Sequence, residues 1–198
     1  MRKISCLLIL LSGLLVCGPG RMNATAQSSS DVAAVLSDMP AHDQQAFNQS
    51  MEAMGALRES ELQNMAVDLQ SAGQGDPTPV KYALNGFAGY VMQPGKETLR
   101  SRCVQAYGQA LDKLSRRADK QFLIRQLQLM GEDDAVPFIQ PFLKDDSLVH
   151  SAAQALATIH TPAAEQALMS ALQDATGNRR TALVEALGDF RSSAALPL

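Results

Sequence analysis

The chain has 198 residues, of which 46% are apolar, 19% are charged and 5% are aromatic. This composition excludes collagen-like, mucin-like and wholly disordered chains, because there is ample apolar surface to bury. Three cysteines form too few disulfide bonds to stabilise a chain of this length, so a disulfide scaffold is excluded as well. The formal net charge of −3 gives no sign of a strongly basic nucleic-acid-binding protein.

Residues 1–26 have the pattern of a secretory signal peptide. Arg2 and Lys3 precede an apolar run over residues 4–16, and Ala24-Thr25-Ala26 has the small-x-small pattern of a cleavage site. The apolar run is shorter than the ~20 residues that a membrane-spanning helix needs. We therefore predict cleavage near Ala26, export to the periplasm or beyond, and no stable membrane span.

A lipid anchor at Cys17 is the alternative for this segment, but Val16 is larger than the small residue that should precede a lipidated cysteine. Cleavage at Ala26 removes three basic residues, which moves the net charge from −3 to −6 and makes a nucleic-acid partner a poor expectation. It also leaves Cys103 as the single thiol, so no internal disulfide is expected.

Residues 27–78 are predicted to form an irregular helical segment followed by a linker. Asp38 lies two residues before Pro40, and this pair favours a helix start at that point. Two glycines and two prolines within residues 73–79 cannot continue a helix. Residues 79–118 then show two apolar stripes at helical spacing, separated by Pro94-Gly95, and we predict a degenerate helical pair there.

The charges of this half of the chain are segregated. Residues 27–76 carry eight acidic residues and one basic residue, whereas residues 96–125 carry eight basic and three acidic residues. Three interpretations stay open at this stage. The opposed charges hold the two segments together, the basic segment forms a face for an anionic partner, or both are solvated helix faces.

The strongest signal is an internal repeat in residues 119–198. When Leu127 is aligned with Leu156 and Leu187, at spacings of 29 and 31 residues, Ala135 also aligns with Ala164 and Ala195. Helices of about a dozen residues are marginal in isolation, and those of each unit are apolar on more than one side. Such units must stack so that each buries a face of its neighbour. We expect an all-α, right-handed superhelix of stacked antiparallel helical hairpins.

Residues 127–139, which read Leu-Gln-Leu-Met-Gly-Glu-Asp-Asp-Ala-Val-Pro-Phe-Ile, and residues 156–172 resemble HEAT repeats of the short bacterial kind. The second unit has His160 where the family pattern has glycine. The resemblance implies an α-solenoid and is barely informative about function. The third unit stops where its second helix should begin, so we expect the last repeat to be truncated and the chain to be the front of a longer protein.

A weaker resemblance covers residues 81–91 and 122–131, which are similar to exported HEAT-repeat proteins that precede a domain related to 3-keto-disaccharide hydrolases. This resemblance implies a possible downstream catalytic domain. The alternative function is therefore the amino-terminal helical part of a larger carbohydrate-processing enzyme. A repeat-fold lyase acting on bilin chromophores is a third and weaker alternative, because export separates it from such substrates.

Residues with chemical potential favour structural roles. His42, His150 and His160 lack partners at metal-binding spacing, and Cys103 lies on the apolar stripe of its helix. The acidic pairs 133–134 and 145–146 lie where helix starts are expected, and we predict that they cap those helices. No phosphate-binding, dinucleotide-binding or nucleophile-elbow motif occurs. We expect no catalytic, cofactor-binding or metal-binding residue and no cofactor.

We therefore expect a non-catalytic module that binds or scaffolds a protein partner, although an enzymatic role stays open. Its working surface is predicted to be the inner face of the superhelix, formed by the second helix of each unit. The polar candidates on those helices are Gln140, Lys144, Gln166, Ser170 and Gln173.

Overall fold

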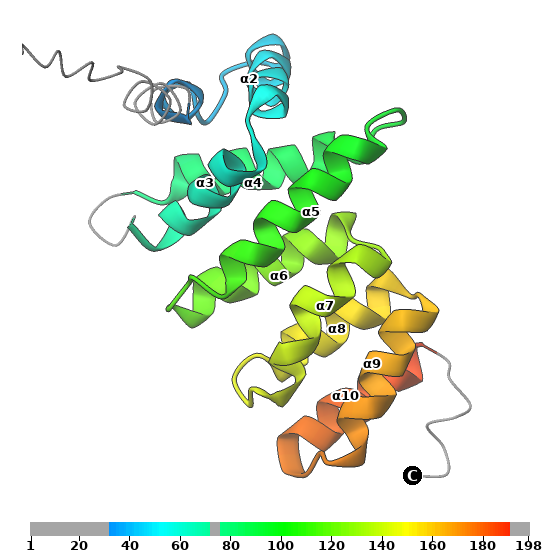
Figure 1. Cartoon of the computed structure of the whole chain (residues 1–198). Helices are drawn as coiled ribbons and strands as arrows, with labels where there is room; N and C mark the ends of the chain where they lie inside the picture. Colours follow the sequence, from blue (N-terminus) through cyan, green and yellow to red (C-terminus); the bar gives the residue numbers. More distant parts are fainter. Residues whose placement is uncertain (1–31, 72–75, 191–198) are drawn as a thin grey trace, which may run out of the picture.

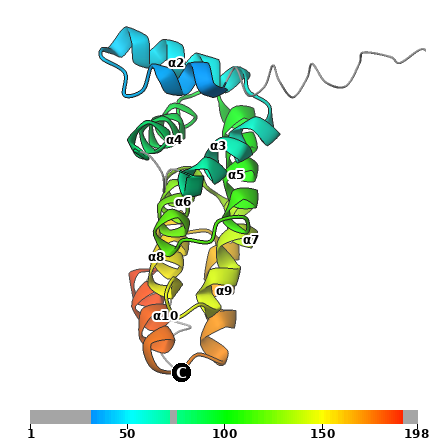
Figure 2. The ribbon, with the colours of Figure 1, turned by 90° about the vertical axis from the view of Figure 1, so that its left-hand side faces the viewer.

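The computed structural model describes residues 32–71 and 76–190, and these residues form helices and turns without a strand. The helices follow one another along an extended stack (Figure 1). Seen from the side, the stack has two layers of helices, and consecutive helices alternate between the layers (Figure 2). This is the all-α solenoid that the repeat predicts.

The first-helix layer consists of α4 (Thr78–Tyr90), α6 (Arg117–Met130), α8 (Val149–Ile159) and α10 (Gly177–Asp189). The second-helix layer consists of α3 (Glu59–Ser71), α5 (Glu97–Leu111), the short α7 (Val136–Ile139) with the 3₁₀ helix η3 (Gln140–Lys144), and α9 (Pro162–Gln173). A 3₁₀ turn, η2 (Asp133–Ala135), leads into α7. The helix α2 (Gln44–Ala56) lies across the amino-terminal end of the stack (Figure 2).

The repeat positions occupy equivalent places in the stack. Leu127, Leu156 and Leu187 lie on α6, α8 and α10, and each side chain is fully buried. Contacts join α6 to α8 and α8 to α10 within the first-helix layer. Ala135 and Ala164, at the start of the second helix of their units, are also fully buried. The predicted alignment is thus confirmed over these positions, and Ala195 lies outside the described residues.

Two predicted helix starts are wrong. The carboxylate that caps α2 is that of Asp43, whose Oδ1 accepts a hydrogen bond from the N–H of Ala46 at 2.8 Å, whereas Asp38 follows the end of a helix over residues 32–37. The buried Met39 lies between these helices, and the chain enters the core there before it turns into α2. Asp145 closes a turn instead of capping α8, because it accepts from the N–H and the hydroxyl of Ser147.

The helix α9 begins at Pro162. Pro162 occupies the first turn, where its missing N–H leaves no bond unmade, and the hydroxyl of Thr161 accepts from the N–H of Ala164 at 3.3 Å. These two local signals fix the point at which the chain turns from α8 into α9.

Three arginines bind the carboxyl ends of other helices. Arg102 donates to the carbonyl oxygen of Gly55 near the end of α2, and Arg116 donates to that of Leu69 near the end of α3, each at 2.5 Å. Arg100 donates to the carbonyl oxygen of Met130, the last residue of α6, at 2.8 Å. A cation at this position compensates both the unpaired carbonyls and the negative end of the helix dipole.

Arg102 and Arg116 of the basic segment therefore hold the front helices through backbone carbonyls, and no ion pair joins the basic segment to the acidic side chains of residues 32–71 and 76. Neutral amides add to these contacts: Gln109 on α5 donates to the carboxylate of Glu59 on α3 at 2.9 Å. The helices α3 and α5 lie side by side in the second-helix layer (Figures 1 and 2). The boundaries at residues 78 and 118 stay predictions. Residues 1–26, the core of the linker and the last eight residues lie outside the described part.

Candidate functional site

The outer surface of the first-helix layer has two hollows. The larger, of about 580 Å³, lies over α4, α6 and α8, and the smaller, of about 80 Å³, lies between α8 and α10. Gln154 on α8 lines both hollows, so they adjoin at this residue. We call this surface the first-layer groove. Its lining includes Lys81, Gln121, Arg125, Gln128 and Leu129 in the larger hollow and His150, Glu185 and Asp189 in the smaller.

Exposed apolar side chains lie on the helices of the same layer. Leu129, which lines the larger hollow, is 53% exposed, and Tyr82 on α4 and Val184 on α10 are 36% and 45% exposed. Most other large apolar side chains of the described residues are buried or packed against the core. Apolar side chains exposed beside a hollow are typical of interaction surfaces, because burying them against a partner is favourable.

Polar side chains cross the groove from one helix to the next. Gln128 on α6 donates to the hydroxyl of Thr158 on α8 at 2.8 Å, and Gln121 donates to the hydroxyl of Ser151 at 3.4 Å. Both pairs span 30 residues, close to the 29- and 31-residue spacings of the repeat. Two glutamines of α6 are therefore joined to hydroxyl groups of the neighbouring helix α8.

The charges of the groove are separated. In the larger hollow, the Nζ of Lys81 lies 5.9 Å from the centroid of the Phe122 ring, and the guanidinium of Arg125 is exposed beside it. The smaller hollow carries the carboxylates of Glu185 and Asp189, both exposed. Arg125 and the two carboxylates make no ion pair within the described residues, so their charges are available to a partner.

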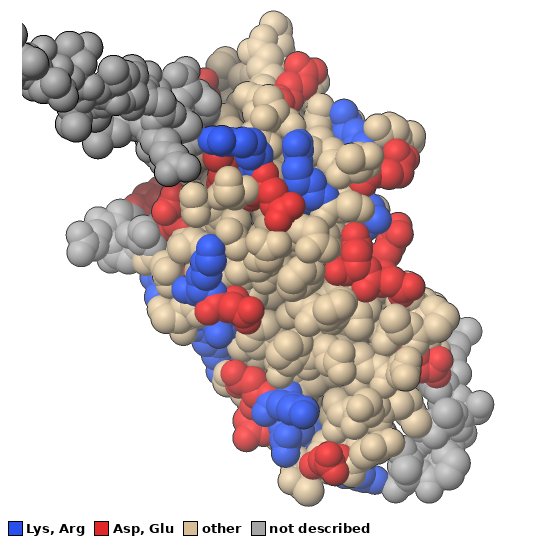
Figure 3. Space-filling view, in the orientation of Figure 1, with Lys and Arg blue, Asp and Glu red and all other residues tan. Residues whose placement is uncertain are grey.

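The five predicted binding residues lie on the opposite layer. Gln140 and Lys144 are on η3, Gln166, Ser170 and Gln173 are on α9, and all five are exposed. Figure 3 looks onto this second-helix layer and shows a broad area over α7 and α9 with few charged side chains. The three residues of α9 share one helix face, but none of the five lines the first-layer groove.

The groove residues were missed because single charged and polar residues on a helix give no periodic signal of their own. Lys81, Arg125 and Glu185 each look like ordinary solvated side chains in the sequence. One signal was available: the 30-residue offset between Gln121 and Ser151 and between Gln128 and Thr158 follows the repeat. It predicts side chains that face each other on neighbouring helices of the first layer.

The residues considered for chemistry have structural positions. Cys103 is buried, and burial raises the pKa of its thiol to about 12, so the side chain behaves as a small apolar group. His160 ends α8 in the left-handed conformation with φ of 56°, and its ring stacks on that of Phe190 at 4.1 Å. The prediction that Cys103 lies on the apolar, buried face of its helix is confirmed.

The acidic residues after α6 bind Arg100, whose side chain is 13% exposed. Its guanidinium lies 3.3 Å from the carboxylate of Glu132 and 3.5 Å from that of Asp134. The same carboxylate of Asp134 accepts from the N–H of Glu132. These carboxylates therefore join α5 to the turn between α6 and α7 and stabilise the stack.

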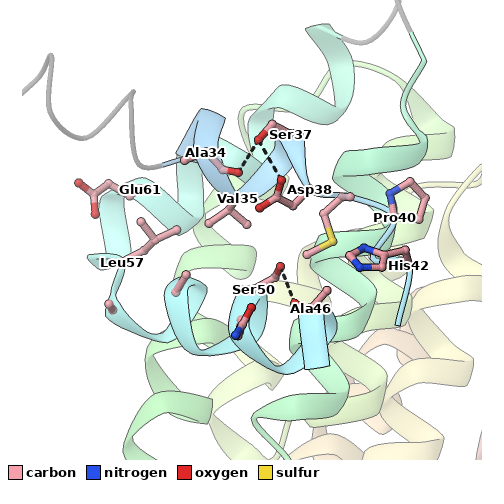
Figure 4. A pocket seen from close by; sticks show the side chains of 14 residues that line it. Ala34, Val35, Ser37, Asp38, Pro40, His42, Ala46, Ser50, Leu57 and Glu61 are labelled. Carbon is pink, nitrogen blue, oxygen red and sulfur yellow. Dashed lines mark hydrogen bonds between the residues drawn. The ribbon is translucent and has the colours of Figure 1, made fainter. Parts of the chain in front are cut away.

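A further cavity of about 840 Å³ lies at the amino-terminal end, outside the repeats, between residues 32–40, α2 and the start of α3 (Figure 4). Val35, Met39 and Leu57 supply apolar walls. The hydroxyl of Ser37 donates to the carbonyl of Ala34 at 2.8 Å, so it is already used within the chain. The carboxylate of Glu61 is likewise held by Arg58, at 2.6 Å.

Neither a metal-binding group of side chains nor a helix long and apolar enough to cross a bilayer occurs within residues 32–71 and 76–190.

Comparison with known families matches residues 104–188 to the family described as HEAT repeats. Neither the curated proteins nor the solved structures give a match to the chain. The matched residues run from α5 to α10 and include the three stacked leucines. Residues 104–188 thus match the HEAT-repeat family, and the helices of this part are stacked as the resemblance predicts.

Proposed function

We propose that the chain is a non-catalytic module that binds a polypeptide partner, and that the first-layer groove is its binding surface. HEAT repeats commonly serve in protein interactions and scaffolding, which supports the general role. The observation that carries the proposal is the coincidence of hollows, exposed apolar side chains and unpaired charges on one layer.

The composition of the groove suits a polypeptide partner. Leu129 offers apolar area whose burial contributes on the order of 1 kcal/mol, given that about half of the side chain is already covered. The carbonyl oxygens of Gln121 and Gln128 can accept from a peptide backbone, and the exposed amide of Gln154 can both donate and accept. This combination of an apolar centre with polar surroundings is the usual composition of a protein interface.

The second-helix layer is the competing surface for the same role. Its candidates Gln140, Lys144, Gln166, Ser170 and Gln173 are exposed on η3 and α9. A face with few charges can also bind a partner (Figure 3). The first-layer groove is favoured because it combines concave surface with free charges of both signs.

Photo-cross-linking at single positions distinguishes the two surfaces. A photoreactive amino acid replaces Leu129 in one chain and Gln166 in another, both exposed positions on helices of opposite layers. After irradiation of the expressing cells, the proposal predicts defined protein adducts at position 129 and few at position 166. Adducts at position 166 alone would move the site to the second-helix layer, and adducts at neither position would contradict a polypeptide-binding role.

We also infer that the chain acts outside the cytoplasm of a bacterial cell. The inference is supported by Arg2 and Lys3, by the apolar run over residues 4–16 and by the Ala24-Thr25-Ala26 sequence. Mass spectrometry of the amino terminus in separated cell fractions tests it. The expected product begins at Gln27 in the periplasm or the medium, and an uncleaved chain in the cytoplasm would contradict the inference.

A further inference from the structure

We infer that the first-layer groove binds an extended segment that carries an acidic residue and, about five or six residues away, a basic residue. The inference rests on the proposed function, since it names the kind of polypeptide that the groove accepts. It is argued from the charges at the two ends of the groove and from the glutamines between them.

One end of the groove is cationic. Lys81 on α4 and Arg125 on α6 line the larger hollow, and no carboxylate is among its lining residues. The Lys81 ammonium lies over the Phe122 ring, which leaves its hydrogen-bond donors free for another group. Arg125 is exposed and makes no ion pair within the described part of the chain. A carboxylate of the partner is the ligand that two such donors favour.

The other end of the groove is anionic. Glu185 and Asp189 lie one helical turn apart on α10, and both carboxylates line the smaller hollow. His150 on α8 faces the same hollow. Neither carboxylate is paired with a cation of the described residues, although Arg179, on the same helix, binds Asp146 at 3.4 Å. A lysine or arginine of the partner would supply the missing positive charge.

The surface between the two ends suits an extended backbone. Gln121 and Gln128 use their amide N–H groups on Ser151 and Thr158 and keep their carbonyl oxygens available. Gln154 lies between the two hollows, and its exposed amide can both donate and accept. An extended segment presents unpaired N–H and C=O groups, which these amides can bind without requiring a particular side chain.

The helix spacing sets the distance between the two charges of the partner. Packed helices lie about 9 Å apart. The cationic end of the groove lies between α4 and α6 and the anionic end between α8 and α10, so the two ends are two helix spacings, or about 18 Å, apart. An extended chain rises about 3.3 Å per residue, so this distance corresponds to five or six residues. The charges of the partner should therefore lie on opposite sides of a short neutral stretch.

A random library of twelve-residue peptides, screened against the immobilised protein, tests this pattern. The expected peptides are enriched in pairs of one acidic and one basic residue that are five or six positions apart. The double variant Lys81→Glu/Arg125→Glu makes the groove acidic at both ends. It should lose at least tenfold in affinity for the selected mixed-charge peptides and should instead select peptides with basic residues at both ends.

The variant Lys96→Glu/Lys113→Glu is the matched control, because it makes the same charge change at two lysines that line neither hollow. It should select the same peptides as the unchanged protein. Enriched peptides without the charge pair, or an unchanged selection by the groove variant, would overturn the inference and leave the proposed function standing. A screen that enriches no peptide would overturn both.

Discussion

Replacing Gly108 by alanine is expected to destabilise the protein, although alanine is the better helix former. Gly108 lies in the middle of α5, where that helix passes the side chain of Phe138 on α7. A Cβ atom at this position would lie closer than 3.0 Å to three carbons of the Phe138 ring. The close approach of α5 and α7 within the second-helix layer therefore depends on the absence of a side chain at residue 108.

Two opposing effects set the size of the change. Alanine in a helix interior is favoured over glycine by about 1 kcal/mol. Overpacking a filled interface costs about 1–3 kcal/mol, and Phe138 is half-buried, so its ring can shift only in part. The net loss in the free energy of unfolding should be up to about 2 kcal/mol, which lowers the melting temperature by up to about 8 °C for a chain of this size.

Urea unfolding followed by circular dichroism measures this loss. Gly188→Ala is the control, because a Cβ atom at residue 188 of α10 meets nothing within 4 Å and alanine should be neutral or slightly stabilising there. In a Phe138→Ala background the clash is gone, so Gly108→Ala should become stabilising. If Gly108→Ala stabilises the otherwise unchanged protein as much as Gly188→Ala does, the close packing of α5 on α7 is refuted.

Three further predictions concern buried and paired groups. Because the pKa of Cys103 is raised to about 12, iodoacetamide at pH 8.5 should modify the native thiol more than about a hundredfold more slowly than the unfolded one, as peptide mapping would show. Arg116→Ala removes the guanidinium that lies 2.6 Å from the buried carboxylate of Asp119. The free energy of unfolding in urea should fall by about 1–3 kcal/mol, a range reduced for the exposure of Arg116. No measurable loss would contradict a stabilising role for this ion pair. Arg100→Lys should lose about 1–2 kcal/mol, because a single ammonium cannot reproduce the planar donors that bind the Met130 carbonyl and two carboxylates; full retention of stability would show that charge alone is sufficient.

The fold was predictable because burial repeats along the chain. Leu127, Leu156 and Leu187 are apolar for the same reason in each unit, since each must fill the space between neighbouring hairpins, and this requirement is visible as a period in the sequence. Helix starts were less predictable. Asp43 and Asp38 are equally good capping residues by type, but Met39 between them is buried and it is Asp43 that begins a helix.

The sequence predicted that a binding surface exists on a helix layer, but not which residues form it. A repeat predicts that a surface exists on each layer, but which layer has concavity depends on how the helices tilt and on side-chain volumes. The choice of Gln166 and its neighbours used exposure on the second helices and could not detect the hollows over α6 and α8. Lys81 and Glu185 are more than a hundred residues apart, and only the stacked helices place them at the two ends of one groove.

The open stacking of the helices is the claim on which the groove and its charge spacing depend. Electron–electron distance measurements between spin labels test it, in a chain in which Cys6 and Cys17 are replaced by serine and Cys103 is protected by burial. One label at Asn85 on α4 is paired with a label at Gln154 on α8 or at Glu185 on α10. The stack predicts that the second distance exceeds the first by about 9 Å, one helix spacing. Equal distances, or a shorter second distance, would mean that the chain folds back into a closed globule and would contradict the account.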